Sequence, residues 1–195
     1  MKKIILASQS PRRKQLLEWA EIEFEIIIKP TPEIYPDDLN TEQIPVHIAR
    51  EKALAVKNEL KNDSIIIAAD TVVVINDKII GKPVNRNDAI KILSELSEKK
   101  HLVITGVVIL NNTKEISFAD VTEVWFNKLT SEQIEFYVDK YKPFDKAGAY
   151  AIQEWIGVVG IKKINGDFYN VMGLPISRVV QELSRLSESQ IVNGE

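Results

Sequence analysis

The chain of 195 residues is 45% hydrophobic and 27% charged, which suits one globular domain, or two lobes sharing a sheet, around a sizeable core. It contains no cysteine and two histidines, His47 and His101, so disulfides and thiol nucleophiles are excluded and a His-based catalytic triad is disfavoured. The net charge of −3, the lack of any run of roughly 20 apolar residues and an apolar start too short for a signal peptide predict a cytoplasmic protein without nucleic-acid or membrane partners. Hydrolysis would therefore depend on carboxylates, lysines or a hard metal bound through oxygen.

The first sixty residues indicate two strands and two helices. Apolar runs predict strands over 3–7 and 23–28, and helical spacing of leucines predicts a helix over 12–20 between them. Prolines mark a loop at 30–36. A second amphipathic helix is expected over 41–60.

Residues 64–75 are rich in β-branched side chains and form either one long strand or a pair of strands. A turn at Asn76 and Asp77 leads to a short strand at 78–80, and a helix capped by Asn87 or Asp88 ends at Leu96. Strands at 102–110 and 116–126 are expected to form a hairpin. The last expected elements are a helix from Thr130 to about 140, a strand at 157–164 and a helix at 174–186. The polar residues 187–195 are expected to form a flexible tail. Helices mixed with hairpins favour an α/β fold with a mixed twisted sheet flanked by helices.

The segment Ser8-Gln9-Ser10-Pro11-Arg12-Arg13 follows the first predicted strand and begins the first helix. Ser10 is a good N-cap, and Pro11 suits the first helical position, where its missing N–H costs nothing. Free backbone N–H groups at a helix start attract anions, and arginine forks match phosphate oxygens. The segment is therefore either a polyphosphate clamp or a capped helix with solvated arginines.

Asp70 and Thr71 interrupt the apolar run at 65–75. A carboxylate within such a strand is costly to bury unless a cation, a metal or a water-filled cleft receives it. Asp70 is therefore the first candidate for a general base or a metal ligand. The alternative is that Asp70 marks a bend between two short strands.

Two lysines and one glutamine extend this candidate site. Lys52 borders the apolar stripe of its predicted helix, so it either reaches into a cleft or extends past the core to water. Lys82 follows the hairpin after Asp70, which would bring it back beside that carboxylate. In segment 145–153, small residues permit close approach of a ligand, and Gln153 offers a donor and an acceptor for a base edge, although a plain loop would look similar.

Seven blocks of the sequence, in order along the chain, resemble the Maf family. They are residues 6–13 (LASQSPRR), 50–53 (REKA), 69–71 (ADT), 81–83 (GKP), 105–107 (TGV), 145–150 (DKAGAY) with Gln153, and 170–175 (NVMGLP). Together they cover the chain from Lys3 to about Leu186. The resemblance implies a single Maf-like domain over 1–186, with two lobes, a nucleotide cleft between them and a fold related to inosine-triphosphate pyrophosphatases.

The resemblance also implies an activity, namely cleavage of a nucleoside triphosphate between its α and β phosphates with a divalent cation, Mg²⁺ or Mn²⁺. Arg12, Thr71 and Gln153 occupy the family's substrate-selecting positions and are similar to the branch that takes dTTP and UTP. The branch that takes 7-methyl-GTP has Trp, Gln and Glu there.

The expected roles combine both lines of reasoning. Asp70 would activate a water or hold the metal, and Lys52 and Lys82 would assist catalysis. Ser8, Ser10 and Arg13 would bind the substrate phosphates, and Glu33 and Glu51 are further candidate metal ligands. The partner implied is a small nucleoside triphosphate, and the family suggests a homodimer. An alternative is a nucleotide-binding regulator of septum formation and cell division with little turnover.

Overall fold

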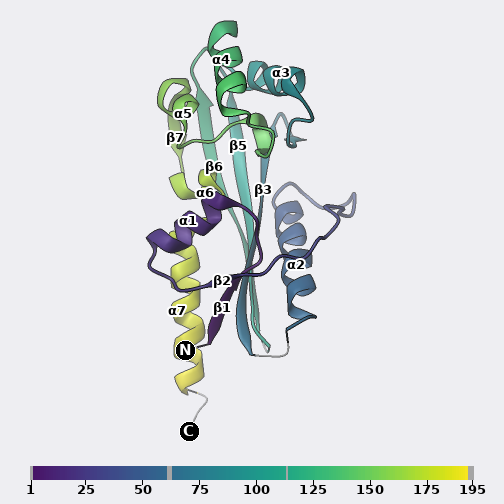
Figure 1. The fold of residues 1–195 in the computed structure, drawn as a ribbon, viewed down its shortest axis with the longest axis vertical. Coiled ribbons are helices and arrows are strands. Elements are labelled where there is room, and N and C mark those ends of the chain that lie inside the picture. Colours follow the sequence, from purple (N-terminus) through teal and green to yellow (C-terminus); the bar gives the residue numbers. More distant parts are fainter. Residues whose placement is uncertain (1, 61–62, 113, 193–195) are drawn as a thin grey trace.

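The computed structural model describes residues 2–60, 63–112 and 114–192, and over these residues it shows a mixed α/β fold built on one sheet (Figure 1). The strands are β1 Lys3–Leu6, β2 Glu25–Ile26, β3 Ser64–Ile75, β4 Lys78–Ile80, β5 Lys100–Leu110, β6 Glu115–Phe126 and β7 Ile161–Asn165. Their order is β2-β1-β3-β5-β6-β7, with β4 beside β3. β1 runs parallel to β2 and β3, and the other pairs are antiparallel, so the mixed sheet is confirmed.

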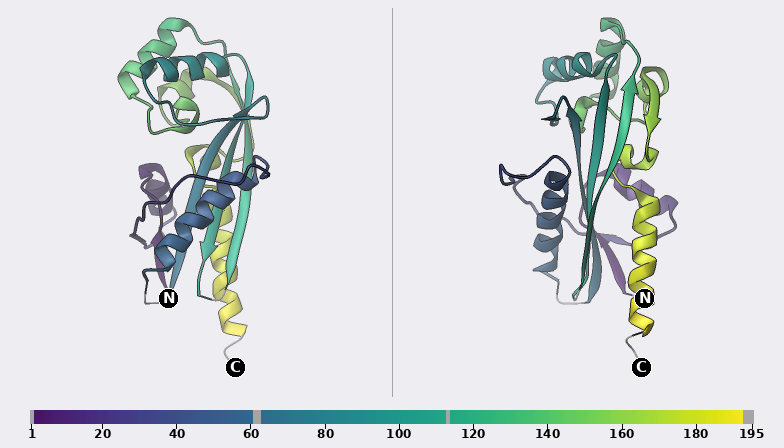
Figure 2. Two further views of the ribbon diagram at one scale, coloured as in Figure 1. Left: turned by 90° about the vertical axis from the view of Figure 1, so that its right-hand side faces the viewer. Right: turned by 180° about the vertical axis from the view of Figure 1, so that it is seen from behind.

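The helices gather around the two ends of the long strands β3, β5 and β6 (Figure 1). They are α1 Pro11–Trp19, α2 Gln43–Lys57, α3 Arg86–Leu96, α4 Ser131–Tyr141, the 3-10 turn η1 Ala147–Ala149, α5 Trp155–Gly160, α6 Phe168–Met172 and α7 Ile176–Val192. At one end, α2 and α7 lie on opposite sides of the sheet, and α3, α4 and α5 surround the other end (Figure 2). No helix within the described residues is both long enough and apolar enough to cross a membrane.

The alternation of side chains along β3 divides the core into two parts. Ile66 and Ala68 face α2 and pack with Ala49 and Ala53 of that helix. On the other face of β3, Ile65, Ile67, Ala69, Val73 and Ile75 belong to a larger core that includes α1, α3, α4 and α7. Since successive residues of a strand point to opposite faces, Asp70 shares the side of α2 and Thr71 the side of α1.

One edge of β3 is paired only in part. β5 pairs with the first edge over residues 66–74. On the second edge, β1 pairs over 64–67 and β4 over 73–75. No strand of the described chain pairs with residues 68–72 on this edge, which we call the β3 gap. Asp70 and Thr71 lie in it, so the sheet itself leaves room for a ligand beside them.

Several predicted boundaries were wrong. Helix α3 is capped by Asn85, not by Asn87 or Asp88. The Asn85 side chain accepts from the N–H of Asp88 at 3.0 Å, and the Asp88 carboxylate accepts from the N–H of Val84 at 3.0 Å. Asn85, Asn87 and Asp88 can all form an N-cap, and these two hydrogen bonds make Asn85 the cap.

The strand predicted at 157–164 is helix α5 followed by β7, and α6 was not predicted at all. A Cβ on Gly157 would lie 1.7 Å from the carbonyl oxygen of Ile152, so this glycine permits a tight helical turn that an apolar pattern does not reveal. Strand β2 and helix α2 are shorter than predicted. Helix α7 begins at Ile176 and continues to Val192, into the segment expected as a tail, and residues 193–195 lie outside the described range.

Candidate active site

A pocket of about 540 Å³ opens at the β3 gap, a size typical of small-molecule sites. Its wall is formed by the start of α1, the loop at 28–33, α2, β3, the segment 145–151 and the junction of α6 and α7. Asp70, Lys52, Lys82, Ser8, Ser10, Arg12, Arg13, Thr71 and Glu33 all line it. Tertiary structure thus brings together nine of the residues selected from the sequence.

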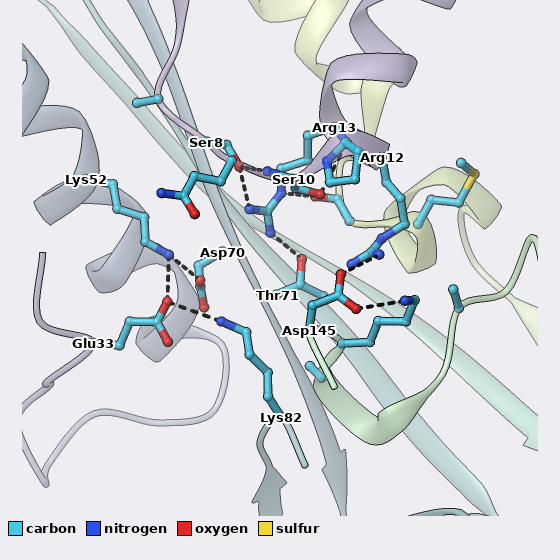
Figure 3. Close-up of a pocket in the computed structure, with 18 of the residues that line it drawn as sticks. Ser8, Ser10, Arg12, Arg13, Glu33, Lys52, Asp70, Thr71, Lys82 and Asp145 are labelled. Carbon is cyan, nitrogen blue, oxygen red and sulfur yellow. Dashed lines mark hydrogen bonds and ion pairs between the residues drawn. The ribbon is translucent and has the colours of Figure 1, made fainter. Parts of the chain in front are cut away.

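The side of the pocket next to α2 holds a cluster of alternating charges, Asp70, Lys52, Glu33 and Lys82, here called the carboxylate–lysine cluster (Figure 3). Lys52 Nζ lies 2.7 Å from Asp70 Oδ1 and 3.1 Å from Glu33 Oε1, and Lys82 Nζ lies 3.6 Å from the same Glu33 oxygen. Partial burial would raise the pKa of Glu33, but the ammonium groups of Lys52 and Lys82 lower it below its ordinary value. The cluster therefore places two carboxylates beside two lysines, and the lysines favour the ionised form of Glu33.

The position of Lys52 depends on close packing of α2 against β5. Asp70 is in register with Gly106 of β5. A Cβ at Gly106 would lie 2.2 Å from the backbone nitrogen of Val46 and 2.3 Å from the carbonyl carbon of Pro45, so the helix backbone occupies that space. Two turns further along α2, Lys52 reaches Asp70. The alternative that Lys52 simply extends to water is wrong.

The start of α1 forms the adjoining wall of the pocket. Ser10 caps the helix by accepting from the Arg13 N–H at 3.5 Å, and Pro11 occupies the first turn, as predicted. Ser8 is buried, and its Oγ accepts from the N–H of Ser10 at 3.2 Å. Residues 8–12 line the pocket, so the positive end of the helix dipole is available to an anion.

Arg13 lines the pocket, and its guanidinium also makes hydrogen bonds within the protein. Its side chain is buried, with Nε donating to the Gly173 carbonyl at 2.7 Å, Nη1 to Ser8 Oγ at 3.1 Å and Nη2 to Thr71 Oγ1 at 2.9 Å. Thr71 Oγ1 also lies 2.9 Å from Thr105 Oγ1. These three hydrogen bonds join α1, β3 and the segment before α7.

Arg12 belongs to a second group of charges on the other side of Thr71 (Figure 3). Its Nη1 lies 3.5 Å from Asp145 Oδ2, and Asp145 Oδ1 accepts from Lys146 Nζ at 2.8 Å. Burial would raise the pKa of Asp145, but Lys146 and Arg12 hold it below its ordinary value. Asp145 and Lys146 were recognised only as part of a motif, because the ion pair of Asp145 with Arg12 spans more than a hundred residues of sequence.

Two predicted site residues do not reach the pocket wall. Gln153 is exposed. The pocket-lining part of its segment ends at Ala151, because the chain turns between these two residues. Glu51 is exposed as well and stands next to Lys52 on α2. Neighbouring residues of a helix point about 100° apart, so Lys52 and Glu51 cannot both face the pocket.

The pocket holds part of the set of oxygen ligands that a divalent cation needs. The described residues contain no group of three or more His, Cys, Asp or Glu side chains that could hold a metal ion. Asp70 and Glu33 nevertheless place two carboxylates around one ammonium group. Magnesium is commonly held by one or two carboxylates together with substrate phosphates and water. These residues therefore fit a cation that arrives with a polyphosphate, and they do not form a cage complete by itself.

Comparisons with known proteins identify the family of this chain. A family model described as Maf-like protein matches residues 3–186. A protein of Parabacteroides distasonis named dTTP/UTP pyrophosphatase is 50% identical over 182 residues, which are 93% of this chain and 94% of that protein. A protein of Cytophaga hutchinsonii with the same name is 52% identical over 188 residues, which are 96% of this chain and 86% of that protein. Among solved structures, a HAM1 protein from Coxiella burnetii covers 65% of this chain and 73% of that chain at 18% identity and a TM-score of 0.42.

Proposed function

This chain belongs to the Maf family, and on that premise we propose that it hydrolyses dTTP and UTP between the α and β phosphates, releasing the monophosphate and pyrophosphate. The observation that carries the proposal is the carboxylate–lysine cluster beside the start of α1 in one pocket. Cations and free helix N–H groups suit a polyphosphate, and a carboxylate among them supplies a base. The names of the relatives support pyrimidine nucleotides as substrates.

Asp70 is the residue proposed to act on water. The carboxylate accepts a proton from a water molecule as the water oxygen attacks the α-phosphorus, and the bond from that phosphorus to the bridging oxygen breaks. Lys52 lies 2.7 Å from Asp70 and orients the carboxylate. Pyrophosphate leaves with the bridging oxygen, and Lys52 and Lys82 stabilise the negative charge that develops on it.

The remaining wall residues hold the substrate. Ser8, Ser10 and the N–H groups at the start of α1 bind phosphate oxygens, while Arg12 and Thr71 lie toward the nucleoside. A divalent cation bound by Asp70 and Glu33 with the triphosphate would neutralise part of its charge. The wider setting we propose is cytoplasmic, with a small nucleotide as partner, no nucleic acid, and a homodimer as the assembly.

The test is pyrophosphate release from a panel of nucleoside triphosphates with Mg²⁺ or Mn²⁺ and after chelation. Wild type is expected to release pyrophosphate from dTTP and UTP and to lose activity on chelation. Asp70→Asn is expected to lose at least about a hundredfold in kcat while keeping its fold.

Asp120→Asn is the matched control. Like Asp70, Asp120 lies in a strand and has a cationic partner, Arg178 at 3.7 Å, but it does not line the pocket. Its kcat should match wild type. Tight nucleotide binding by wild type without release of any product would reject hydrolysis and leave the regulatory alternative.

A further inference from the structure

We propose that Asp145 and Lys146 read the base of the bound nucleotide, as a fixed acceptor beside a fixed donor, and select bases that carry a carbonyl next to a ring N–H. This inference rests on the proposed function, because it takes the carboxylate–lysine cluster as the site of the phosphates. It assigns base selection to a pair of side chains that face the pocket, in place of the exposed Gln153.

The two groups of charged side chains lie on opposite sides of the pocket, and we assign them to opposite ends of the substrate. Asp70, Glu33, Lys52 and Lys82 lie on one side of Thr71, and Asp145 lies on the other (Figure 3). Both groups line the same pocket. If the triphosphate occupies the first group, the nucleoside extends from it toward the second, in which Asp145 supplies an acceptor and Lys146 a donor.

Lys146 is held rigidly, as a donor that reads a base must be. Its side chain is 9% exposed, and its Nζ lies 2.8 Å from Asp145 Oδ1 and 3.7 Å from Glu154 Oε1. Glu154 accepts a hydrogen bond from the Tyr137 hydroxyl, which in turn accepts from the Ala151 N–H at 3.1 Å. Burial, together with Glu154, raises the pKa of Tyr137, so its hydroxyl keeps the proton that it donates.

Asp145 complements this donor as an acceptor. Its side chain is 58% exposed although it pairs with Lys146 and Arg12, so its oxygens remain open to a ligand in the pocket. The contact with Arg12 is 3.5 Å long, at the limit of a hydrogen bond, and a ligand can replace it at small cost. An ionised carboxylate accepts hydrogen bonds and cannot donate them.

The pattern of one donor beside one acceptor matches a particular class of base. Uracil and thymine present the O4 carbonyl, an acceptor, next to the N3–H, a donor. Cytosine presents an amino donor next to an unprotonated ring nitrogen, the reverse order. A base with the wrong order would place its own acceptor against the Asp145 carboxylate and its own donor against the Lys146 ammonium, and such mismatched contacts are unfavourable.

The experiment compares kcat/KM for UTP, dTTP, CTP and N3-methyl-UTP in wild type and Asp145→Asn. An asparagine keeps the shape of the side chain and adds an N–H₂ donor in place of a carboxylate oxygen. Wild type should prefer UTP over both CTP and N3-methyl-UTP. In the variant, each preference should fall by about tenfold or more, through slower UTP turnover and unchanged or faster CTP turnover.

Asp139→Asn is the matched control, since Asp139 is 55% exposed and ion-paired with Arg86 but lies outside the pocket wall. Lys146→Arg, which keeps the charge, should retain more of the preference for UTP than Lys146→Gln. Equal losses for all four nucleotides in Asp145→Asn, with unchanged ratios, would show that the pair is structural and would overturn the inference.

Failure of the proposed function would be seen separately. If wild type releases no pyrophosphate from any nucleotide, dissociation constants for α,β-methylene analogues of UTP and CTP replace the kinetic ratio. A preference for the UTP analogue that falls in Asp145→Asn would support base reading without hydrolysis. Equal binding of both analogues by wild type would overturn the inference that Asp145 and Lys146 read the base.

Discussion

Arg13 carries a charge into the pocket wall without presenting it to the solvent. Its guanidinium is buried, and burial lowers its pKa, against the raising effect of the nearby Asp70 charge. Hydrogen bonds to Ser8, Thr71 and Gly173 occupy its three nitrogens. At the scale of the residue, we therefore expect Arg13 to act as a positioning group that fixes three segments of the pocket wall.

Replacing Arg13 by lysine tests this role. One ammonium group cannot reproduce three hydrogen bonds in fork geometry, so Arg13→Lys should lower the free energy of unfolding by about 2–3 kcal/mol. It should also reduce kcat more than it changes KM. Urea denaturation and steady-state kinetics measure the two effects, with Arg86→Lys as a surface control. A variant as stable as wild type with only a raised KM would identify Arg13 as a direct phosphate ligand.

His101 is a buried titratable residue with a consequence for stability. It is 1% exposed, its Nε2 lies 2.8 Å from the Tyr150 hydroxyl oxygen, and its ring packs edge-on against Phe126. Burial lowers its pKa from 6.5 to about 4. Between these values the unfolded chain binds a proton at this position and the folded chain does not, so stability falls as the pH falls from 6.5 to about 4.

The size of this effect is predicted from the shift. Between about pH 7.5 and about pH 5, His101 should remove roughly 2 kcal/mol from the free energy of unfolding. Urea denaturation of wild type and His101→Gln at both pH values isolates the contribution, since the other groups titrate in both proteins. An equal loss of stability in the two proteins would contradict the buried neutral state of His101.

At the scale of elements, the contact of α2 with β5 places Lys52 at the Asp70 carboxylate. Gly106 opposes Asp70 across the strand pair, and the backbone at Pro45 and Val46 fills the space above it. Any side chain at this position would push α2 outward. Lys52, carried on the same helix, would then move away from Asp70.

Gly106→Ala is therefore expected to lower the free energy of unfolding by about 2 kcal/mol or more, because the added methyl group overlaps the backbone of α2. Its kcat should fall as well. Gly81→Ala is the matched control, since no atom lies within 4 Å of a Cβ at that glycine. Thermal unfolding and pyrophosphate release compare the two variants, and a fully active Gly106→Ala protein would show that α2 need not sit so close.

At the scale of the whole molecule, the pocket joins segments from both ends of the chain. Residues from the start of α1, from β3, from the segment 145–151 and from the turn before α7 all line it. A ligand there would contact segments far apart in the chain, from residues 7–33 and from residues 145–173. Its binding energy should therefore stabilise the whole fold and not one half of it.

The prediction uses Asp70→Asn, so that the nucleotide is not consumed. UTP at about a hundred times its dissociation constant should add roughly 2.7 kcal/mol to the free energy of unfolding and raise the Tm of a single transition. Calorimetry at increasing UTP concentration measures this shift. Two separate transitions, of which one moves, would show that the two ends of the sheet unfold independently.

Local chemistry in the sequence determined much of the fold. Ser10 with Pro11, and Thr130, mark helix starts whose caps form as expected, because capping depends on residues three apart. The β-branched run at 64–75 is one long strand. Asp70 was identified as a candidate site residue because it is a carboxylate within an apolar strand, where a buried charge is costly.

Only the tertiary structure decided how these residues act together. The β3 gap exists because β1 ends at Leu6 and β4 pairs only from Val73 onward, a matter of strand register that no local pattern encodes. The use of Arg13 as a positioning group, the exclusion of Gln153 from the wall and the pairing of Arg12 with Asp145 all depend on contacts across long sequence distances. Hydrogen-bond partners and facing directions are set by packing, so the residue types were predictable and their roles were not.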